Sequence, residues 1–326
     1  MQNNRKSRPA GRSLAVLGAL LGVLAGPGAS AQLVSGLAGA SGSTVGPDGA
    51  LYVTEGAAGR VTRIDPATGA TSVFASGLPP AVLPVGGAVD LAFLDDVAYV
   101  LVTMVGPPFG AHVDGLYRVD GPTSFTVVAD IGGYAAANPP DTPFDLPTGV
   151  QYAIENFRGG FLVSDGHHNR LLQVDTRGAI EVFKAFDNIV PTGLEVVGDA
   201  VLVAQAGAAP HLPADGRIVA VEARSGAATL VASGGPLMID VQRGRGMSLF
   251  ALSQGTWDGA FPGSPALPGT GALFEVLPEG ALRAVAAGLT MPTSLEILGN
   301  TAYVVTLTGE VWAFADVASP PFGRSP

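Results

Sequence analysis

The sequence predicts an all-β fold, a six-bladed β-propeller of four-stranded blades. Two observations lead to this prediction. One cassette of short β-rich runs, separated by glycine- and proline-rich turns, recurs six times at intervals of about 40–50 residues. No segment shows a long helical period of apolar residues. Because a single four-stranded sheet cannot bury both of its faces, the blades must pack against one another around a ring.

The cassette nearest the N-terminus shows how its strands are predicted. Residues 51–55, 60–65 and 71–78 are alternating or β-branched runs bounded by turn-forming residues. The first of these runs, the second strand of its blade, recurs at residues 97–102, 161–165, 201–205, 249–253 and 302–306. The next run, the third strand, recurs at residues 115–120, 170–175, 216–222, 271–276 and 309–314. The recurrence predicts the same strand order in every blade.

The outermost strand is missing after the last cassette. Outer strands are predicted at residues 73–78, 127–131, 182–186, 230–234 and 285–289. A sixth run of this kind, residues 33–37, stands before the first cassette. We therefore expect the mature N-terminus to pair with the third strand of the last blade. That pairing closes the ring and removes the exposed strand edges of an open array.

The N-terminal segment has the pattern of a secretory signal peptide. A basic stretch at residues 5–12 precedes an apolar stretch at residues 14–24 and the small-residue site Ala29-Ser30-Ala31. We expect a signal peptide at residues 1–31, the propeller at residues 32–317 and a short tail at residues 318–326. The apolar stretch is too short to span a bilayer and no cysteine follows it. The expected location is the periplasm or the extracellular space, with no stable membrane anchor.

The charge balance disfavours nucleic acid as a partner, and we expect none. Residues 1–31 hold four of the 17 Lys and Arg and none of the 27 Asp and Glu, so the mature chain has 13 basic residues and a net charge of −14. Phosphate binding needs a basic surface. The chain has no cysteine, and a domain of this size can bury a sufficient core without disulfides.

One segment resembles a known repeat. Residues 162–175 are similar to an NHL-type repeat, with an Asp, a loop containing Asn, an Arg and a strand ending in Asp. Further matching segments are residues 190–194, 210–216, 252–255, 269–272 and 301–312. Together they make residues 33–314 resemble the ScyD/ScyE family of exported propeller proteins, named after a gene cluster for the cyanobacterial pigment scytonemin. The resemblance implies a propeller and an exported location, and no particular chemistry.

All four histidines are predicted on one face of the ring. Loops between second and third strands contain His112, His167, His168 and His211, and Asp165 and Asn169 stand beside them. One interpretation is a site for a polar ligand or a divalent cation, with Asp165, His167, His168 and His211 as the metal ligands. The other is that these side chains orient the loops and cap turns. No cofactor other than such a cation is indicated.

Acidic residues recur on the innermost strands. Alignment of the cassettes places six residues at equivalent positions: Val45, Asp90, Gln151, Glu195, Asp240 and Glu296. The four carboxylates are expected near the central channel, where they either hold a cation or line a water-filled axis. Their repulsion should raise their pKa values.

Three further residues are candidates on the same face, and three acids belong to the other face. Glu55 ends a second strand, and Gln254 and Trp257 lie in the long loop of the fifth cassette. By contrast, Asp65, Asp120 and Asp175 end third strands, and we expect them to accept hydrogen bonds in turns.

Two functions remain open at this point. The first is a non-catalytic exported protein that binds a small molecule, a glycan or a protein on the loop face. The second is a metal-assisted enzyme of the lactonase or sugar-dehydrogenase type that acts at the channel mouth. The chain has no Gly-x-Ser-x-Gly, no cysteine nucleophile and no phosphate-binding glycine loop.

Overall fold

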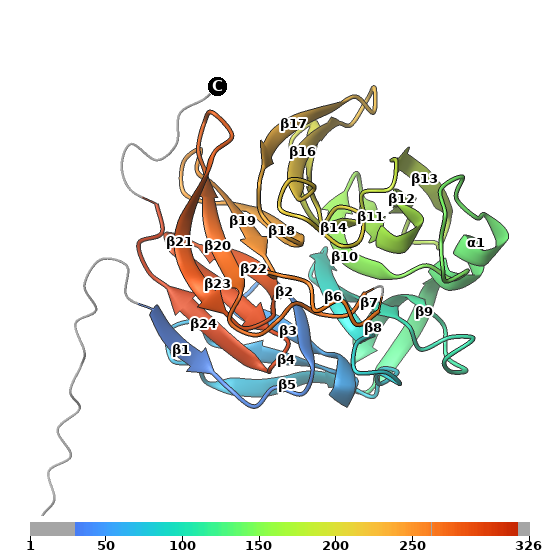
Figure 1. The fold of residues 1–326 in the computed structure, drawn as a ribbon. Helices are drawn as coiled ribbons and strands as arrows, with labels where there is room; N and C mark the ends of the chain where they lie inside the picture. The colour runs from blue at the N-terminus through green and yellow to red at the C-terminus, as the bar shows by residue number, and fades with distance from the viewer. Residues whose placement is uncertain (1–29, 262, 319–326) are drawn as a thin grey trace, which may run out of the picture.

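The computed structural model describes residues 30–261 and 263–318. These residues form 24 strands in six four-stranded antiparallel sheets, arranged as a ring (Figure 1). The predicted six-bladed propeller is confirmed. The predicted leader, up to residue 29, and the tail beyond residue 318 lie outside the described residues. The described residues contain no helix long and apolar enough to cross a membrane.

Each blade runs from an inner to an outer strand. Blade 1 contains β2 (Ala40–Val45), β3 (Leu51–Glu55), β4 (Arg60–Ile64) and β5 (Thr71–Ser76). Blade 2 contains β6 (Gly87–Leu94), β7 (Val97–Thr103), β8 (Gly115–Gly121) and β9 (Ser124–Asp130). Blade 3 contains β10 (Gln151–Phe157), β11 (Gly160–Asp165), β12 (Arg170–Val174) and β13 (Ile180–Ala185). Blade 4 contains β14 (Pro191–Val197), β15 (Ala200–Gln205), β16 (Arg217–Glu222) and β17 (Ala228–Ser233). Blade 5 contains β18 (Met238–Arg243), β19 (Leu249–Ser253), β20 (Gly271–Val276) and β21 (Leu282–Leu289). Blade 6 contains β22 (Pro292–Leu298), β23 (Thr301–Thr306), β24 (Glu310–Phe314) and β1 (Ser30–Val34).

The hydrophobic core lies between the blades. Each of six clusters of buried side chains joins two neighbouring blades. Between blades 2 and 3, for example, Leu101 and Leu116 meet Phe161 and Leu172, all fully buried. The first strands of neighbouring blades contact one another around the axis. Side chains of the first strands therefore surround whatever space remains at the centre.

The N-terminal strand closes the ring, with one correction to its position. β1 pairs with β24, with Gln32 opposite Trp312. The sequence predicted this strand at residues 33–37, but the paired strand is Ser30–Val34. The chain leaves the extended conformation at Gly36, whose φ is 81°. The backbone N–H of Leu37 then donates to the carbonyl of Gly309 at 3.0 Å.

The described helices are short. The sequence predicted none, but α1 (Ile131–Ala137) follows β9, and the Asp130 side chain caps it by accepting from the Gly133 N–H. Single 3₁₀ turns, η1 (Gly56–Ala58) and η2 (Gly166–His168), follow β3 and β11. The two 3₁₀ turns place their residues on the same face of the ring.

Candidate functional site

We call the face that carries the connections between second and third strands the loop face. These connections are residues 56–59, 104–114, 166–169, 206–216, 254–270 and 307–309. Because strands alternate in direction, the segments leading into the first strands reach the same face. All four histidines lie in these connections, where the sequence placed them.

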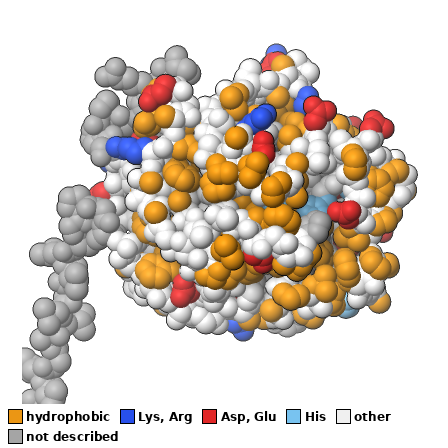
Figure 2. Space-filling model, in the orientation of Figure 1, with side chains coloured by type: hydrophobic (Ala, Val, Ile, Leu, Met, Phe, Trp, Pro, Cys, Tyr) orange, Lys and Arg blue, Asp and Glu red, His pale blue; other side chains and the backbone are white. Residues whose placement is uncertain are grey.

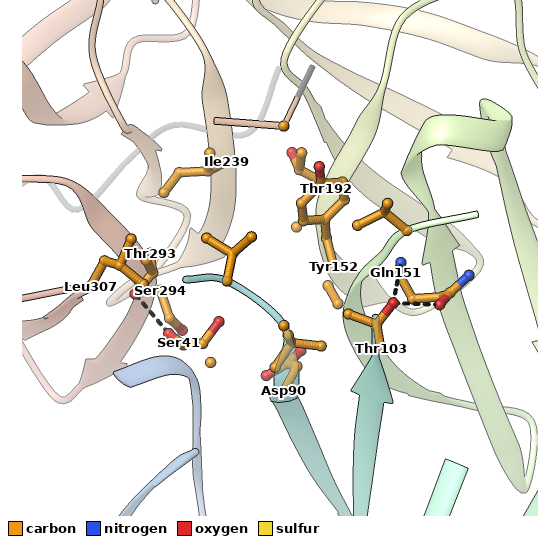
Figure 3. Close-up of a pocket in the computed structure, with 18 of the residues that line it drawn as sticks. Ser41, Asp90, Thr103, Gln151, Tyr152, Thr192, Ile239, Thr293, Ser294 and Leu307 are labelled. Carbon is orange, nitrogen blue, oxygen red and sulfur yellow. Dashed lines mark hydrogen bonds between the residues drawn. The ribbon is translucent and has the colours of Figure 1, made fainter. Parts of the chain in front are cut away.

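A cavity of about 810 Å³ opens on the loop face and extends along the axis. Much of its wall is apolar, and includes Leu83, Val85, Met104, Leu146, Ile239 and Leu307. Figure 3 shows Ile239, Tyr152, Thr192 and Asp90 projecting from different strands toward this space. The volume falls within the range of about 300–1,000 Å³ that is typical of small-molecule sites. The arrangement can therefore surround a small organic compound.

Exposed apolar residues lie on the loop face, and two of them, Phe109 and Phe261, line the cavity. On loop-face segments, the large exposed hydrophobic residues are Val82, Phe109, Phe144, Leu212, Phe261 and Leu267. Figure 2 shows hydrophobic side chains over much of one face of the ring, with few Lys or Arg among them. Apolar patches of this kind often mark binding sites.

Two of the predicted histidines line the cavity. The Tyr152 hydroxyl and His167 Nε2 form a hydrogen bond of 2.9 Å. Burial lowers the pKa of His167 and raises that of Tyr152. His211 Nδ1 lies 2.7 Å from the Gly207 carbonyl, which fixes its proton on Nδ1 and leaves Nε2 as an acceptor. Burial lowers the pKa of His211 as well.

His168 has a structural environment. Its ring is fully buried: Nδ1 lies 3.1 Å from an Arg170 nitrogen, and Nε2 lies 2.9 Å from the Leu146 carbonyl. Since Arg170 can only donate, His168 carries its proton on Nε2. His112 is exposed and does not line the cavity. Of the four histidines, only His167 and His211 are thus brought to the cavity.

Asp165 and Asn169 organise the same loop. The buried Asp165 carboxylate accepts from Arg170 Nε at 2.8 Å and from Gln151 Nε2 at 3.0 Å. Asn169 adopts a left-handed φ of 55°, and its side-chain oxygen accepts the N–H groups of Ile189 and Val190 at 2.9 Å. These contacts hold the η2 turn in place against the segment that leads into blade 4.

Glu55 has the same surroundings as Asp165 in another blade. It ends β3, is buried, and pairs with Arg60 at 2.6 Å. Burial alone would raise the pKa of Glu55, but hydrogen bonds from Arg60, Thr62 and the Ala38 N–H hold it below the ordinary value. An acid at the end of a second strand and an arginine at the start of the third therefore form a repeated internal ion pair.

Gln254 and Trp257 take different positions in the long loop of blade 5. Gln254 lines the cavity, and its Oε1 accepts the Ala266 N–H at 2.9 Å. Trp257 lies to the side and packs edge-on against His211, with 5.4 Å between ring centroids. The loop extends to blade 3, where a Cβ at Gly263 would lie 3.2 Å from His167 Cε1.

The acids of the inner strands lie at two levels, which corrects the single ring inferred from the sequence. Asp90 and Asp240 form one level. Each Oδ2 accepts a backbone N–H from the next blade at 2.8 Å, Ile154 for Asp90 and Leu295 for Asp240. These two carboxylates join adjacent blades.

The second level consists of Glu155, Glu195 and Glu296. Each lies four residues after the residue that opens its strand, whereas Asp240 lies two residues after Met238. At about 3.3 Å per residue, this level is roughly 13 Å from the start of the strand. The alignment had matched Gln151, which opens β10, with Glu195, and so it missed Glu155. Val45 lies five residues after Ala40, which opens β2, so it is not equivalent to Glu195 either.

The reason for the misalignment is a second Pro-Thr-Gly segment, residues 147–149, which precedes β10. The alignment matches it with the Pro-Thr-Gly segment at residues 191–193, which opens β14, and so shifts blade 3 by four residues. The register of β10 with β11 and that of β14 with β15 shift at the same place, between the first and the fourth residue of the strand, so these bulges do not cause the offset. The spacing of an acid from the start of its strand was the signal for Glu155.

Burial raises the pKa values of all five inner acids, and repulsion between carboxylates adds to this for Asp90, Glu155, Asp240 and Glu296. The pKa of Glu155 rises to about 8, through burial and then the nearby Glu195. The pKa values of Glu195 and Asp240 each rise to about 7, mainly through burial. Those of Asp90 and Glu296 also rise well above the ordinary range. This group holds protons that exposed carboxylates would lose.

The divalent-cation prediction has no ready set of ligands in the described part of the chain. Among residues 30–261 and 263–318, no three His, Asp or Glu side chains are arranged to hold a metal ion. Asp165 and His168 instead face Arg170. His211 belongs to a different blade.

Comparisons with known proteins show the fold. No protein-family model matches the chain, and no curated protein matches its sequence. Three similar solved structures are a gluconolactonase from Xanthomonas campestris, a PQQ-bound aldose sugar dehydrogenase from Streptomyces coelicolor and a virginiamycin B lyase from Staphylococcus aureus. Their TM-scores are 0.61, 0.60 and 0.53 and their identities 12%, 13% and 13%. The alignments cover 88%, 89% and 88% of this chain and 89%, 99% and 98% of those proteins. The chain is a six-bladed β-propeller of the architecture that these enzymes share.

Proposed function

We propose that the protein binds a small, largely apolar organic molecule in the loop-face cavity, without chemical conversion. The observation that carries this proposal is the cavity itself, about 810 Å³ in volume and walled mainly by apolar side chains. Burial of apolar surface supplies affinity, while a few polar groups such as Gln254 and Tyr152 orient the ligand. We also propose that the protein is exported to the periplasm or the extracellular space and that it is a relative of the ScyD/ScyE family.

The cavity does not suit an anionic cofactor. One similar structure is a PQQ-bound dehydrogenase, and PQQ carries carboxylates. The described residues that line the cavity include Asp90, Asp145, Glu155, Asp240 and Glu296 but no Lys or Arg. Placing an anion there would bring like charges together without a compensating donor. No step that uses PQQ is proposed.

A second candidate function is an enzyme of the lactonase or lyase kind. His211 favours it, because its lowered pKa and its fixed proton leave Nε2 free to take a proton at the cavity wall. The Tyr152–His167 pair faces the same cavity. The comparisons support this candidate because lactonase, lyase and dehydrogenase activities occur on this fold.

The binding proposal is tested with Nile red, an uncharged apolar dye whose fluorescence rises in apolar surroundings. We expect saturable binding of about one dye per protein. Ser41 lines the cavity, and Ser41→Phe should fill part of it and weaken binding. The matched control is Ser72→Phe on the exposed outer strand β5, which should leave binding unchanged. Equal binding by both variants, or binding that does not saturate, would contradict the proposal.

The enzyme candidate is tested by incubating the protein with glucono-δ-lactone, with and without added Ca²⁺. The activity is expected to disappear in a His167→Ala, His211→Ala double variant and to persist in His112→Ala. Hydrolysis no faster than in buffer would remove lactonase activity toward this substrate and leave the binding proposal in place.

A further inference from the structure

The charge of the cavity is one-sided. Five carboxylates and two imidazoles line it, and no Lys or Arg does so among the described residues. Arg243 lies beside Glu195, and Glu195 itself does not line the cavity. A site with this composition attracts positive charge and repels negative charge.

Glu296 differs from the other acids of the cavity. Asp90 and Asp240 each accept backbone N–H groups of the next blade, and Glu155 accepts the N–H of Asn156 at 3.0 Å. In the described part of the chain, no hydrogen bond to the Glu296 carboxylate is found. A deep carboxylate with no donor is costly unless a ligand or a proton satisfies it.

The charged groups that raise the pKa of Glu296 are all acidic. They are Asp240, Glu155, Asp90 and Glu195, contributed by β18, β10, β6 and β14. A cation beside Glu296 therefore meets carboxyl groups from several blades. Its arrival favours loss of protons from carboxylates that otherwise keep them near neutral pH.

The rest of the cavity suits an apolar body rather than a bare metal ion. Leu83, Met104, Ile239 and Leu307 line it, and its volume far exceeds the space that a single ion needs. Described side chains offer no cluster of three metal ligands. A molecule that is apolar over most of its length and cationic at one end satisfies both parts of the cavity.

We propose that the ligand is an organic amine, whose apolar body packs against the cavity wall and whose ammonium group donates hydrogen bonds to Glu296. This inference rests on the proposed function and narrows it to a ligand class. The ammonium N–H groups supply the donors that Glu296 lacks. Asp240 and Glu155 add attraction without having to contact the amine directly.

The test compares three probes with one skeleton: 1-naphthylmethylamine, 1-naphthylmethanol and 1-naphthoate. At pH 7 the amine is cationic, the alcohol neutral and the acid anionic. We expect the amine to bind about tenfold more tightly than the alcohol, because a charge-assisted hydrogen bond is added to the same apolar contact. The naphthoate should bind more weakly than either. Isothermal titration calorimetry measures all three.

Glu296→Gln should reduce amine affinity to about that of the alcohol. The matched control is Glu181→Gln, an exposed glutamate on β13, which should keep the full preference. A second readout needs no variant. Amine binding at pH 7 should release protons, detected from its heat in buffers of different ionisation enthalpy, and the alcohol should release none.

The outcomes separate the two proposals. If the alcohol binds and the amine binds no more tightly, without proton release, the amine proposal is wrong and the binding proposal stands. If neither naphthyl compound nor Nile red binds, both are wrong. If the amine preference survives Glu296→Gln in a folded protein, Glu296 is not the residue that receives the ammonium group.

Discussion

Two kinds of buried carboxylate occur in this protein, and their neighbours give them opposite electrostatic character. Glu55 faces an arginine across the start of the next strand, and its pKa is lowered. The inner acids Glu155, Glu195 and Asp240 face one another, and their pKa values are raised. The first arrangement stabilises the ionised form, and the second stabilises the protonated form.

The raised pKa values predict that stability falls as pH rises. Between the ordinary carboxylate range near 4 and the raised values of about 7 to 8, the folded state binds more protons than the unfolded state. The contribution of these groups to the free energy of unfolding therefore decreases across this window, by at most about 1.4 kcal/mol per pH unit for each group. Urea denaturation at pH 5, 7 and 9 measures the change.

Glu155→Gln should reduce this pH dependence, because it removes one of the titrating groups. Glu181→Gln, on the surface, should reproduce the parent curve. A free energy of unfolding that rises from pH 5 to pH 8 would show that the inner acids are ionised in the folded protein, contrary to their raised pKa values.

The ion pair of Asp165 predicts a large loss of stability. Asp165→Asn leaves the buried Arg170 without its carboxylate, and we expect a cost of about 3 kcal/mol in urea denaturation. The control is Asp175→Asn, whose partner Arg177 is 88% exposed, with an expected cost below about 1 kcal/mol. If Asp165→Asn instead keeps the parent stability but no longer binds Nile red, the result favours the interpretation of Asp165 as a ligand-binding residue over the structural one.

Residue types on the loop face were predictable, but their partners were not. The histidines could be assigned to loops because strand runs bracket them. That His168 binds the Leu146 carbonyl, 22 residues away, depends on the path of the segment leading into blade 3. Such a contact has no periodic signal. The expected roles of Asp65 and Asp175 as turn acceptors are seen, through Oδ1 contacts with Ala67 and Ala179 at 2.8 and 2.9 Å.

At the scale of the element, β1 is the strand whose removal has the clearest expected effect. A chain that begins at Gln32 keeps the pairs of Gln32 and Val34 with β24, whereas one that begins at Leu37 loses the strand. We expect the shorter chain to be less stable by several kcal/mol, roughly 3 or more, and to associate through the exposed edge of β24. Urea denaturation and size-exclusion chromatography measure this. Identical midpoints would contradict the closure argument.

Strand positions were predictable because each strand repeats a local pattern, and strand register was not. Turn residues bound the runs well enough to locate blades. The bulges near the starts of β10, β14, β18 and β22 share no residue type, since the residues at the shifts include Tyr152, Thr192, Ile239 and Thr293. The helix α1 was missed for a related reason: seven residues with two glycines are too few to show a helical period.

At the scale of the whole molecule, export makes a prediction about the mature chain. Cleavage after Ala31 would remove Ser30 and Ala31 from β1 and leave Gln32 as the first residue. We expect intact-mass analysis of the exported protein to give a chain beginning at Gln32. A chain that retains the leader would contradict the cleavage site, and one that begins beyond Gly36 would contradict both the cleavage site and the need for this strand.

The pairing that closes the ring also determines how the molecule responds to mechanical force. Ser30, at the start of β1, lies opposite Phe314, at the end of β24, so these two strand ends are at the same end of blade 6. A pull applied between them separates β1 from β24 like a zipper, with one hydrogen-bonded pair loaded at a time. A shearing pull would load all the pairs together. Tension between the start of β1 and the end of β24 therefore opens the ring at low force, and it takes Val34 out of the cluster between blades 6 and 1.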